Sequence, residues 1–124
     1  MALLIDTQTL VWLRTGDPKL SRAAQRAIAD EGRALFVSAV TAYEFADLDA
    51  RGRFGAALDL QSTLDRFFMT VLDFPEACWR IAAELPMFHR DPVDRMLIAH
   101  ALHAGLTLVT ADETIRRYPV PTLW

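Results

Sequence analysis

Four short, uninterrupted apolar runs constrain the fold of this chain more than any other feature of its sequence. They are Leu3–Ile5, Leu35–Ser38, Met69–Leu72 and Leu106–Val109, and Val120–Leu123 reads as a further edge strand. Runs this short and this apolar are typical of strands buried on both faces, which occur in parallel sheets covered by helices. The sequence therefore belongs to the α/β class, with a central parallel sheet of about five strands.

The segments between these runs have apolar residues at helical spacing. Ser21 and Asp91 are expected N-cap residues, Pro92 fits the first helical turn, and Gly105 fits the position just after a helix. A break at 51–55 suggests two antiparallel helices joined by a loop. The expected helices span 7–13, 21–30, 41–50, 56–67, 75–85, 91–104 and 112–117.

Composition limits the classes of protein that need to be considered. With 124 residues, of which 52% are hydrophobic, residues 1–124 are expected to form a single domain with a substantial core. The single cysteine, Cys78, excludes an intrachain disulfide, and the first apolar run is too short for a signal peptide or a membrane span. We expect a cytoplasmic protein without a membrane partner. The net charge of −3 gives no global reason to expect nucleic acid, so such binding must depend on a local site.

Four acidic residues occupy equivalent places in the expected topology: Asp6, Glu44, Asp94 and Asp112. Each follows a strand or lies in the first turn of a helix that leads to the next strand. In right-handed βαβ units these positions all lie at the carboxyl edge of the sheet. We therefore expect the four carboxylates to meet at one edge.

Helix capping explains each acid singly, and Asp91 with Asp94 also resembles a capping pair, which leaves open whether Asp91 assists the site or only caps. Capping does not explain why every interior junction carries an acid. Asp94 also heads an apolar stripe of its helix through Ile98 and Ala101, so its carboxylate is expected to point inward.

Clustered carboxylates in a partly dry cleft need a cation, since repulsion and desolvation raise their pKa values. Oxygen ligands favour Mg²⁺ or Mn²⁺ over zinc, and such ions support hydrolysis of phosphodiesters. Three hydroxyl residues, Thr7, Ser38 and Thr110, lie where they can support a ligand carboxylate, a bound water or a phosphate oxygen. They are explained equally well as ordinary strand-end or turn residues.

Several segments together resemble one known family. Asp6-Thr7 after the first strand, the segment Ser38–Glu44 with sequence SAVTAYE, His89–Ala99 with sequence HRDPVDRMLIA, and Leu108–Asp112 with sequence LVTAD resemble the PIN domain. The similarity is greatest to the VapC-type toxins of bacterial type II toxin–antitoxin pairs, and it extends over essentially the whole chain.

The resemblance implies a three-layer α/β/α PIN-like fold and a Mg²⁺- or Mn²⁺-dependent endoribonuclease that hydrolyses RNA. It further implies a toxin neutralised by a VapB-like antitoxin, and a homodimer. The family's catalytic quartet falls on Asp6, Glu44, Asp94 and Asp112. Asp6 and Asp94 would be direct metal ligands, Glu44 would support them or bind a second ion, and Asp112 is the quartet's most variable member.

Other polar residues have weaker patterns. The candidates for contacts to the RNA backbone are arginines, namely Arg90, Arg95 and Arg14. The histidines His89, His100 and His103 are interpreted as surface or interface residues because no set of ligands surrounds them. The aromatic residues are expected mostly in the core, except for some near Gly52 that would line a groove for an antitoxin helix.

Two other readings remain open. A catalytically silent PIN-like binding module would keep the fold and the caps, but it would not depend on a divalent metal. A phosphoryl-aspartate α/β protein fits less well. A receiver domain needs a lysine at the carboxyl edge, whereas the only lysine, Lys19, follows no late strand, and a dehalogenase-like phosphatase needs a second aspartate where Gln8 stands.

Overall fold

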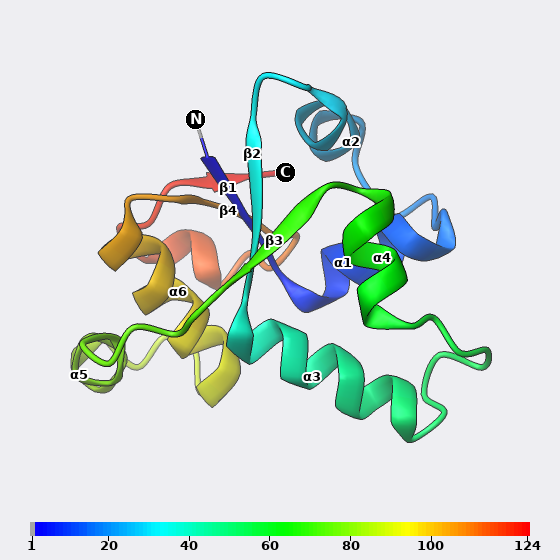
Figure 1. The fold of residues 1–124 in the computed structure, drawn as a ribbon. Helices are drawn as coiled ribbons and strands as arrows, with labels where there is room; N and C mark the ends of the chain where they lie inside the picture. The colour runs from blue at the N-terminus through cyan, green and yellow to red at the C-terminus, as the bar shows by residue number, and fades with distance from the viewer. Residues whose placement is uncertain (1) are drawn as a thin grey trace.

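The computed structural model describes residues 2–124 and contains one five-stranded sheet in the order β3-β2-β1-β4-β5 (Figure 1). Every neighbouring pair of strands is parallel. The strands are β1 (Ala2–Ile5), β2 (Ala34–Ser38), β3 (Met69–Leu72), β4 (Thr107–Val109) and β5 (Thr122–Leu123). The parallel sheet predicted from the apolar runs is therefore confirmed.

Six α-helices and one 3₁₀ turn connect the strands. They are α1 (Thr7–Thr15), α2 (Arg22–Ala29), α3 (Ala39–Ala50), α4 (Leu60–Arg66), α5 (Cys78–Glu84), α6 (Pro92–Ala104) and η1 (Ile115–Arg117). Ser21 and Asp91 cap α2 and α6 as expected, and Gly105 ends α6 with a left-handed φ of 67°. Three expected helices are clearly shorter than predicted: the one from 56 begins only at Leu60, the one from 75 begins only at Cys78, and 112–117 forms a single 3₁₀ turn.

The two faces of the sheet bury different helices. Leu3 and Ile5 of β1 pack in a core that includes Leu10 of α1 and Phe45 of α3, together with residues of α2 and α4. Leu4, which points to the opposite face, packs with Ile98 of α6. The α5 helix in turn packs on α6. This alternation of side chains along β1 produces the three-layer α/β/α arrangement.

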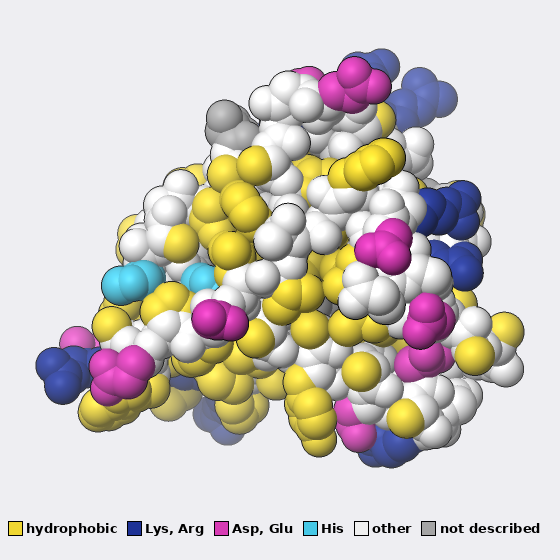
Figure 2. Space-filling view, viewed as in Figure 1, with side chains coloured by type: hydrophobic (Ala, Val, Ile, Leu, Met, Phe, Trp, Pro, Cys, Tyr) yellow, Lys and Arg dark blue, Asp and Glu magenta, His cyan; other side chains and the backbone are white. Residues whose placement is uncertain are grey.

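The parallel strands also give the sheet two unlike edges. β1 and β2 lead into α1 and α3 at the carboxyl edge, toward the lower side of Figure 1, and α6 also begins on that side. On the face drawn in Figure 2, hydrophobic side chains lie over the middle of the molecule, and most visible Lys and Arg side chains lie at its periphery. Within residues 2–124 no helix is long and apolar enough to cross a membrane.

Candidate active site

A polar cleft of about 440 Å³ opens at the carboxyl edge of the sheet, and it brings the four predicted acids together. Its lining residues are Asp6, Thr7, Gln8, Glu44, Leu48, Asp91, Asp94, Ala111 and Asp112. These residues come from the start of α1, the middle of α3, the start of α6 and the loop after β4. The parallel topology therefore places residues that are far apart in sequence around one cleft.

Asp6 is the most buried of the four acids, with 7% of its surface exposed. It follows β1 directly and caps α1, since its Oδ1 accepts a hydrogen bond of 2.8 Å from the Thr9 backbone N–H. Burial raises the pKa of the Asp6 carboxyl above its ordinary value, against the opposing effect of hydrogen bonds from Thr110 and Thr9. The fold thus holds a carboxylate in a place where its negative charge is costly.

Asp94 lies in the first turn of α6, three residues after the N-cap Asp91. Burial, followed by the charges of Asp91, Asp112 and Asp6, raises the pKa of Asp94 to about 7, although His89 partly offsets this effect. Asp91 itself accepts hydrogen bonds from the backbone N–H groups of Val93 and Asp94 at 2.8 and 3.4 Å. Asp91 therefore caps the helix and also adds to the negative potential at Asp94.

Asp112 is held from two sides. Its Oδ1 accepts hydrogen bonds from the backbone N–H groups of Thr114 (2.8 Å) and Ile115 (3.4 Å), and its Oδ2 accepts one from His89 Nε2 at 2.8 Å. Burial acts to raise the pKa of Asp112, but the hydrogen bonds from His89 and Thr114 outweigh it and lower the pKa. Asp112 is therefore a cap, as the sequence allowed, and also a partner of His89.

His89 is the site residue that the sequence pattern did not identify. Its Nε2 lies 2.9 Å from Asp94 Oδ2 as well as 2.8 Å from Asp112 Oδ2, and its Nδ1 accepts a hydrogen bond from the Asp91 N–H at 3.1 Å. The interpretation of His89 as a surface residue is wrong. The only sequence signal for His89 was its place in the HRDPVD segment, close to Asp94. The bend that brings its ring into the cleft is irregular, so no helical or strand spacing predicts it.

The three predicted hydroxyl residues have different surroundings. Thr7 donates a hydrogen bond to Glu44 Oε1, which links α1 to α3, and Thr110 Oγ1 accepts one from the Asp112 N–H at 3.1 Å. Ser38 lies apart from the residues that line the cleft: it caps α3 and contacts Nδ1 of the buried His100 at 3.0 Å. Thr7 and Thr110 therefore support acids, Ser38 has a structural environment, and His100 is not a surface residue.

The three predicted arginines also differ. The Arg95 side chain is buried and donates hydrogen bonds of 2.7–3.2 Å to four backbone carbonyls, those of Ala82, Leu85, Pro86 and His89. It has no free face for a phosphate, so the expectation of an RNA contact by Arg95 is not met. Arg14 lies in the last turn of α1, at the end of the helix away from Asp6. Arg90 is exposed and directly follows His89.

The donor atoms of the cleft fit a hard divalent cation. Carboxylate oxygens of Asp94 and Asp112 lie within 4.8 Å of one another, and His89 Nε2 contacts both of them. Asp6 adds a further buried carboxylate, and burial together with the charges of neighbouring acids raises the pKa of Asp94. A cation bound there would favour the ionised form of each carboxylate, and oxygen-rich ligands select Mg²⁺ or Mn²⁺.

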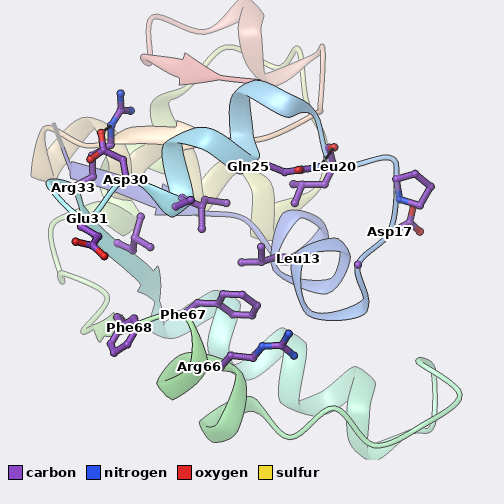
Figure 3. A pocket seen from close by; sticks show the side chains of 15 residues that line it. Leu13, Asp17, Leu20, Gln25, Asp30, Glu31, Arg33, Arg66, Phe67 and Phe68 are labelled. Carbon is purple, nitrogen blue, oxygen red and sulfur yellow. Dashed lines mark hydrogen bonds and ion pairs between the residues drawn. The ribbon is translucent and has the colours of Figure 1, made fainter.

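A larger cavity, of about 790 Å³, lies at the opposite, amino edge of the sheet (Figure 3). Leu13 of α1, Ile28 of α2, Leu35 of β2 and Phe67 after α4 contribute its apolar lining. Its acids do not converge: Asp30 lies in its own turn, where it accepts hydrogen bonds from the Gly32 N–H and from Arg33 Nε. The larger volume therefore lacks the arrangement needed for acid or metal chemistry.

Comparison with known proteins agrees with this geometry. The model of the PIN domain family matches residues 3–121. The chain is 34% identical over 130 residues to Ribonuclease VapC22 of Mycobacterium tuberculosis, covering 98% of both proteins. Among solved structures, VapBC2 from Rickettsia felis bound to a promoter DNA fragment gives a TM-score of 0.75 at 18% identity, covering 98% of this chain and 97% of the other.

A second solved structure gives the same fold. The sarcin-ricin loop cleaving toxin VapC20 of Mycobacterium tuberculosis has a TM-score of 0.70 at 18% identity, and the match covers 95% of each chain. The family model spans nearly all of the sequence, and the 34% identical relative is matched end to end. This chain therefore belongs to the PIN domain family.

Proposed function

We propose that this protein is a divalent-metal-dependent endoribonuclease, the toxin of a VapC-type toxin–antitoxin pair. The observation that supports this most strongly is the carboxylate cluster around Asp94, whose pKa is raised to about 7 by burial and by neighbouring acids. The 34% identical relative is a ribonuclease, which supports RNA as the substrate. A silent binding module would have no need of such a cluster, because capping alone does not require three further acids within reach of Asp94.

Mg²⁺ or Mn²⁺ is the proposed cofactor. Asp6 and Asp94 would be its direct ligands, and Glu44 and Asp112 would complete or support the set. When bound, such an ion supplies an activated water and stabilises the leaving oxygen of the phosphodiester. The protein's own contribution is to orient the ligands: Thr9 fixes Asp6, and Thr7 fixes Glu44.

Arg90 is the best-placed of the predicted RNA contacts. It is exposed and adjoins His89, whose ring lies inside the acidic cleft, so a phosphate held by Arg90 would lie near the proposed metal ligands. Arg14 is a weaker candidate because α1 separates it from Asp6. A cytoplasmic location, as expected from the sequence, fits this substrate.

The proposed protein partner is a VapB-like antitoxin. Several structural neighbours are toxin–antitoxin complexes, including a DNA-bound VapBC from Salmonella typhimurium with a TM-score of 0.67 at 19% identity, covering 98% of this chain and 96% of the other. Coexpression with a small DNA-binding protein encoded beside this gene, followed by copurification and loss of RNA cleavage, tests the pairing. Cleavage that persists in a stable complex would contradict neutralisation.

A second copy of this chain is the proposed occupant of a groove of about 600 Å³ between α3 and α6. Val40, Val93 and Met96 give the groove apolar walls, and Tyr43 beside them is 73% exposed. The Asp47–Arg51 pair at its rim, 2.9 Å apart, carries both charges. A two-fold axis that passes between these two side chains would place each charge opposite its complement in the other copy.

Light scattering coupled to size exclusion tests this homodimer. Tyr43→Asp is expected to give a monomer, whereas Phe68→Asp, which changes an exposed aromatic residue lining the cavity at the opposite edge, is expected to stay dimeric. A monomeric parent protein, or equal effects of both changes, would exclude this interface.

The catalytic proposal is tested with purified protein and a mixed RNA substrate. Cleavage is expected with Mg²⁺ or Mn²⁺ and is expected to be lost with EDTA or in Asp94→Asn. Asp65→Asn is the matched control, because Asp65 is an exposed acid on α4 that pairs with Gln61 and lies outside the cleft. Cleavage with EDTA and by Asp94→Asn that equals cleavage by the parent with Mg²⁺ would contradict the metal mechanism. No cleavage by the parent, with either metal, would favour the silent binding module.

A further inference from the structure

His89 connects two carboxylates that belong to different elements of the cleft. Asp94 lies on α6 and Asp112 in the loop after β4, yet one oxygen of each lies within 2.9 Å of the same His89 nitrogen. Two carboxylate oxygens this close to one another repel strongly when both are ionised. A hydrogen-bond donor between them offsets part of that repulsion and keeps them together.

The orientation of the His89 ring is set by its other nitrogen. Nδ1 accepts a hydrogen bond from the Asp91 backbone N–H at 3.1 Å, so its lone pair is engaged there. A neutral imidazole carries a single ring proton, and this contact assigns that proton to Nε2. Nε2 is therefore a donor toward Asp112, and it has no lone pair to offer to a metal ion.

The backbone of His89 is held as firmly as the ring. Its N–H donates to Tyr118 Oη at 2.8 Å, and its carbonyl accepts a hydrogen bond of 3.2 Å from the buried Arg95. Tyr118 Oη in turn donates to the Pro86 carbonyl at 2.6 Å, which closes the turn that carries His89. The ring is thus fixed by its backbone and by Asp91, independently of the two carboxylates that it contacts.

We propose that His89 is a positioning residue that holds Asp94 and Asp112 at the spacing a divalent ion requires while remaining outside the ligands of that ion. The inference rests on the proposed metal-dependent function and adds to it a residue outside the acidic quartet. Each carboxylate oxygen has more than one lone pair, so an oxygen that contacts His89 keeps capacity for a cation. Hydrogen bonds of this kind to ligating carboxylates tune metal affinity in proteins.

Mn²⁺ affinity, measured by titration calorimetry, tests the proposal without any assay of cleavage. His89→Ala is expected to weaken Mn²⁺ binding by about tenfold or more, whereas His89→Gln, whose amide N–H reaches the same place, stays within about threefold of the parent. His103→Ala is the matched control, because His103 is an exposed histidine in the last turn of α6, away from the cleft. Thermal melting confirms that each variant is folded.

A second measurement uses the unaltered protein. Long-range ¹H–¹⁵N spectra at alkaline pH report which ring nitrogen of a neutral histidine carries the proton. For His89 we expect the Nε2–H form both without Mg²⁺ and at saturating Mg²⁺. An Nε2 that loses its proton when Mg²⁺ is added would show a direct metal ligand and would overturn the proposal.

The possible failures are distinguishable. If the parent binds Mn²⁺ and Asp94→Asn does not, but His89→Ala binds as tightly as the parent or more tightly, the positioning role is wrong and the proposed function stands. If His89→Gln is as weak as His89→Ala, a donor at this place is not what matters, and the inference is again wrong. If the parent itself binds no Mn²⁺, the metal centre of the proposed function fails, and this inference fails with it.

Discussion

Two aspartates, one at each edge of the sheet, have pKa values shifted in opposite directions by their surroundings. At the amino edge, Asp30 is exposed, and hydrogen bonds from Gly32 and Arg33 lower its pKa below the ordinary value. At the carboxyl edge, burial and neighbouring acids raise the pKa of Asp94 to about 7. Asp30 is stabilised by its own turn, whereas Asp94 is held in a place that disfavours its charge.

The larger of these two cavities is therefore not the one that contains the clustered acids. The amino-edge cavity, at about 790 Å³, is larger than the acidic cleft, at about 440 Å³, but its Asp30 is paired with Arg33 in the same turn. Carboxyl groups whose pKa values are raised by burial and by neighbouring acids within a cleft are candidates for functional sites. If this reading is correct, changes at the carboxyl edge should affect metal binding and changes at the amino edge should not.

The largest expected difference is between Asp6→Asn and Asp30→Asn. Asparagine caps helices as well as aspartate does, so Asp6→Asn keeps the cap on α1 and removes only the charge. RNA cleavage and Mn²⁺ affinity are expected to fall by about 100-fold or more, because a direct ligand is lost. Melting temperature should stay the same or rise. Asp30→Asn should leave cleavage and affinity unchanged, and equal losses in the two variants would remove the distinction between the edges.

The next expected effect concerns the turn that carries His89. Arg95→Met leaves four backbone carbonyls without their donor, which should cost about 2–4 kcal/mol of unfolding free energy. Arg66→Met, at the rim of the amino-edge cavity, removes an exposed charge and should change stability by at most about 0.5 kcal/mol.

Urea unfolding measures both arginine variants, and hydrogen exchange locates the change. Faster exchange in Arg95→Met should be concentrated in residues 86–91. A loss spread evenly over the protein would show that Arg95 supports the whole core rather than this turn.

The pH dependence of stability should also come from the carboxyl edge. Between the ordinary pKa of 3.8 and the folded-state value of about 7, Asp94 holds a proton in the folded protein that the unfolded chain releases. Stability of the metal-free protein should therefore fall as pH rises through this window, by about 1–2 kcal/mol after solvent screening is considered. Burial of Asp6 acts in the same direction, whereas the lowered pKa of Asp112 makes stability fall as the pH drops below about 4, outside this window.

Chemical denaturation across this pH range, with and without Mg²⁺, checks the prediction. Asp94→Asn should flatten the profile, and Mg²⁺ should restore stability at the upper end by neutralising the carboxylates. A metal-free parent that becomes more stable from pH 4 to pH 7 would contradict a raised pKa of Asp94 in the folded protein.

The fold was largely predictable because buried parallel strands leave a strong pattern. The run Met69–Leu72 matches β3 residue for residue, and the caps at Ser21 and Asp91 mark the starts of α2 and α6. The poorly predicted starts have different causes. Asp59 caps α4 by accepting a hydrogen bond from the Ser62 N–H, but it was not among the expected caps, and this helix was expected from residue 56. Ala77, which precedes α5, makes no side-chain capping hydrogen bond, so Pro75 alone suggested too early a start.

In the cleft, the residues placed by the sheet topology were predictable, and the residues placed by a local turn were not. The convergence of Asp6, Glu44, Asp94 and Asp112 follows from parallel strands, and it was therefore accessible from sequence. The positions of His89 and Arg95 depend on how residues 86–91 bend back over α6, which involves Tyr118, a residue far along the sequence. No spacing rule relates those residues, so His89 was missed and Arg95 was assigned to RNA.

The smallest expected effect tests whether the amino edge has backbone strain, in contrast to the electrostatic cost at the carboxyl edge. Phe68, which lines the larger cavity, is 89% exposed and has a left-handed φ of 55°, a conformation that asparagine adopts more readily than phenylalanine. Phe68→Asn should therefore stabilise the protein by about 0.5 kcal/mol. Trp79→Asn, which changes an exposed aromatic residue within α5, should instead be neutral or destabilising. Mn²⁺ affinity should be the same in both variants, because neither residue lines the cleft. A Phe68→Asn protein that is less stable than Trp79→Asn would mean that packing of the Phe68 ring over the cavity outweighs its backbone strain.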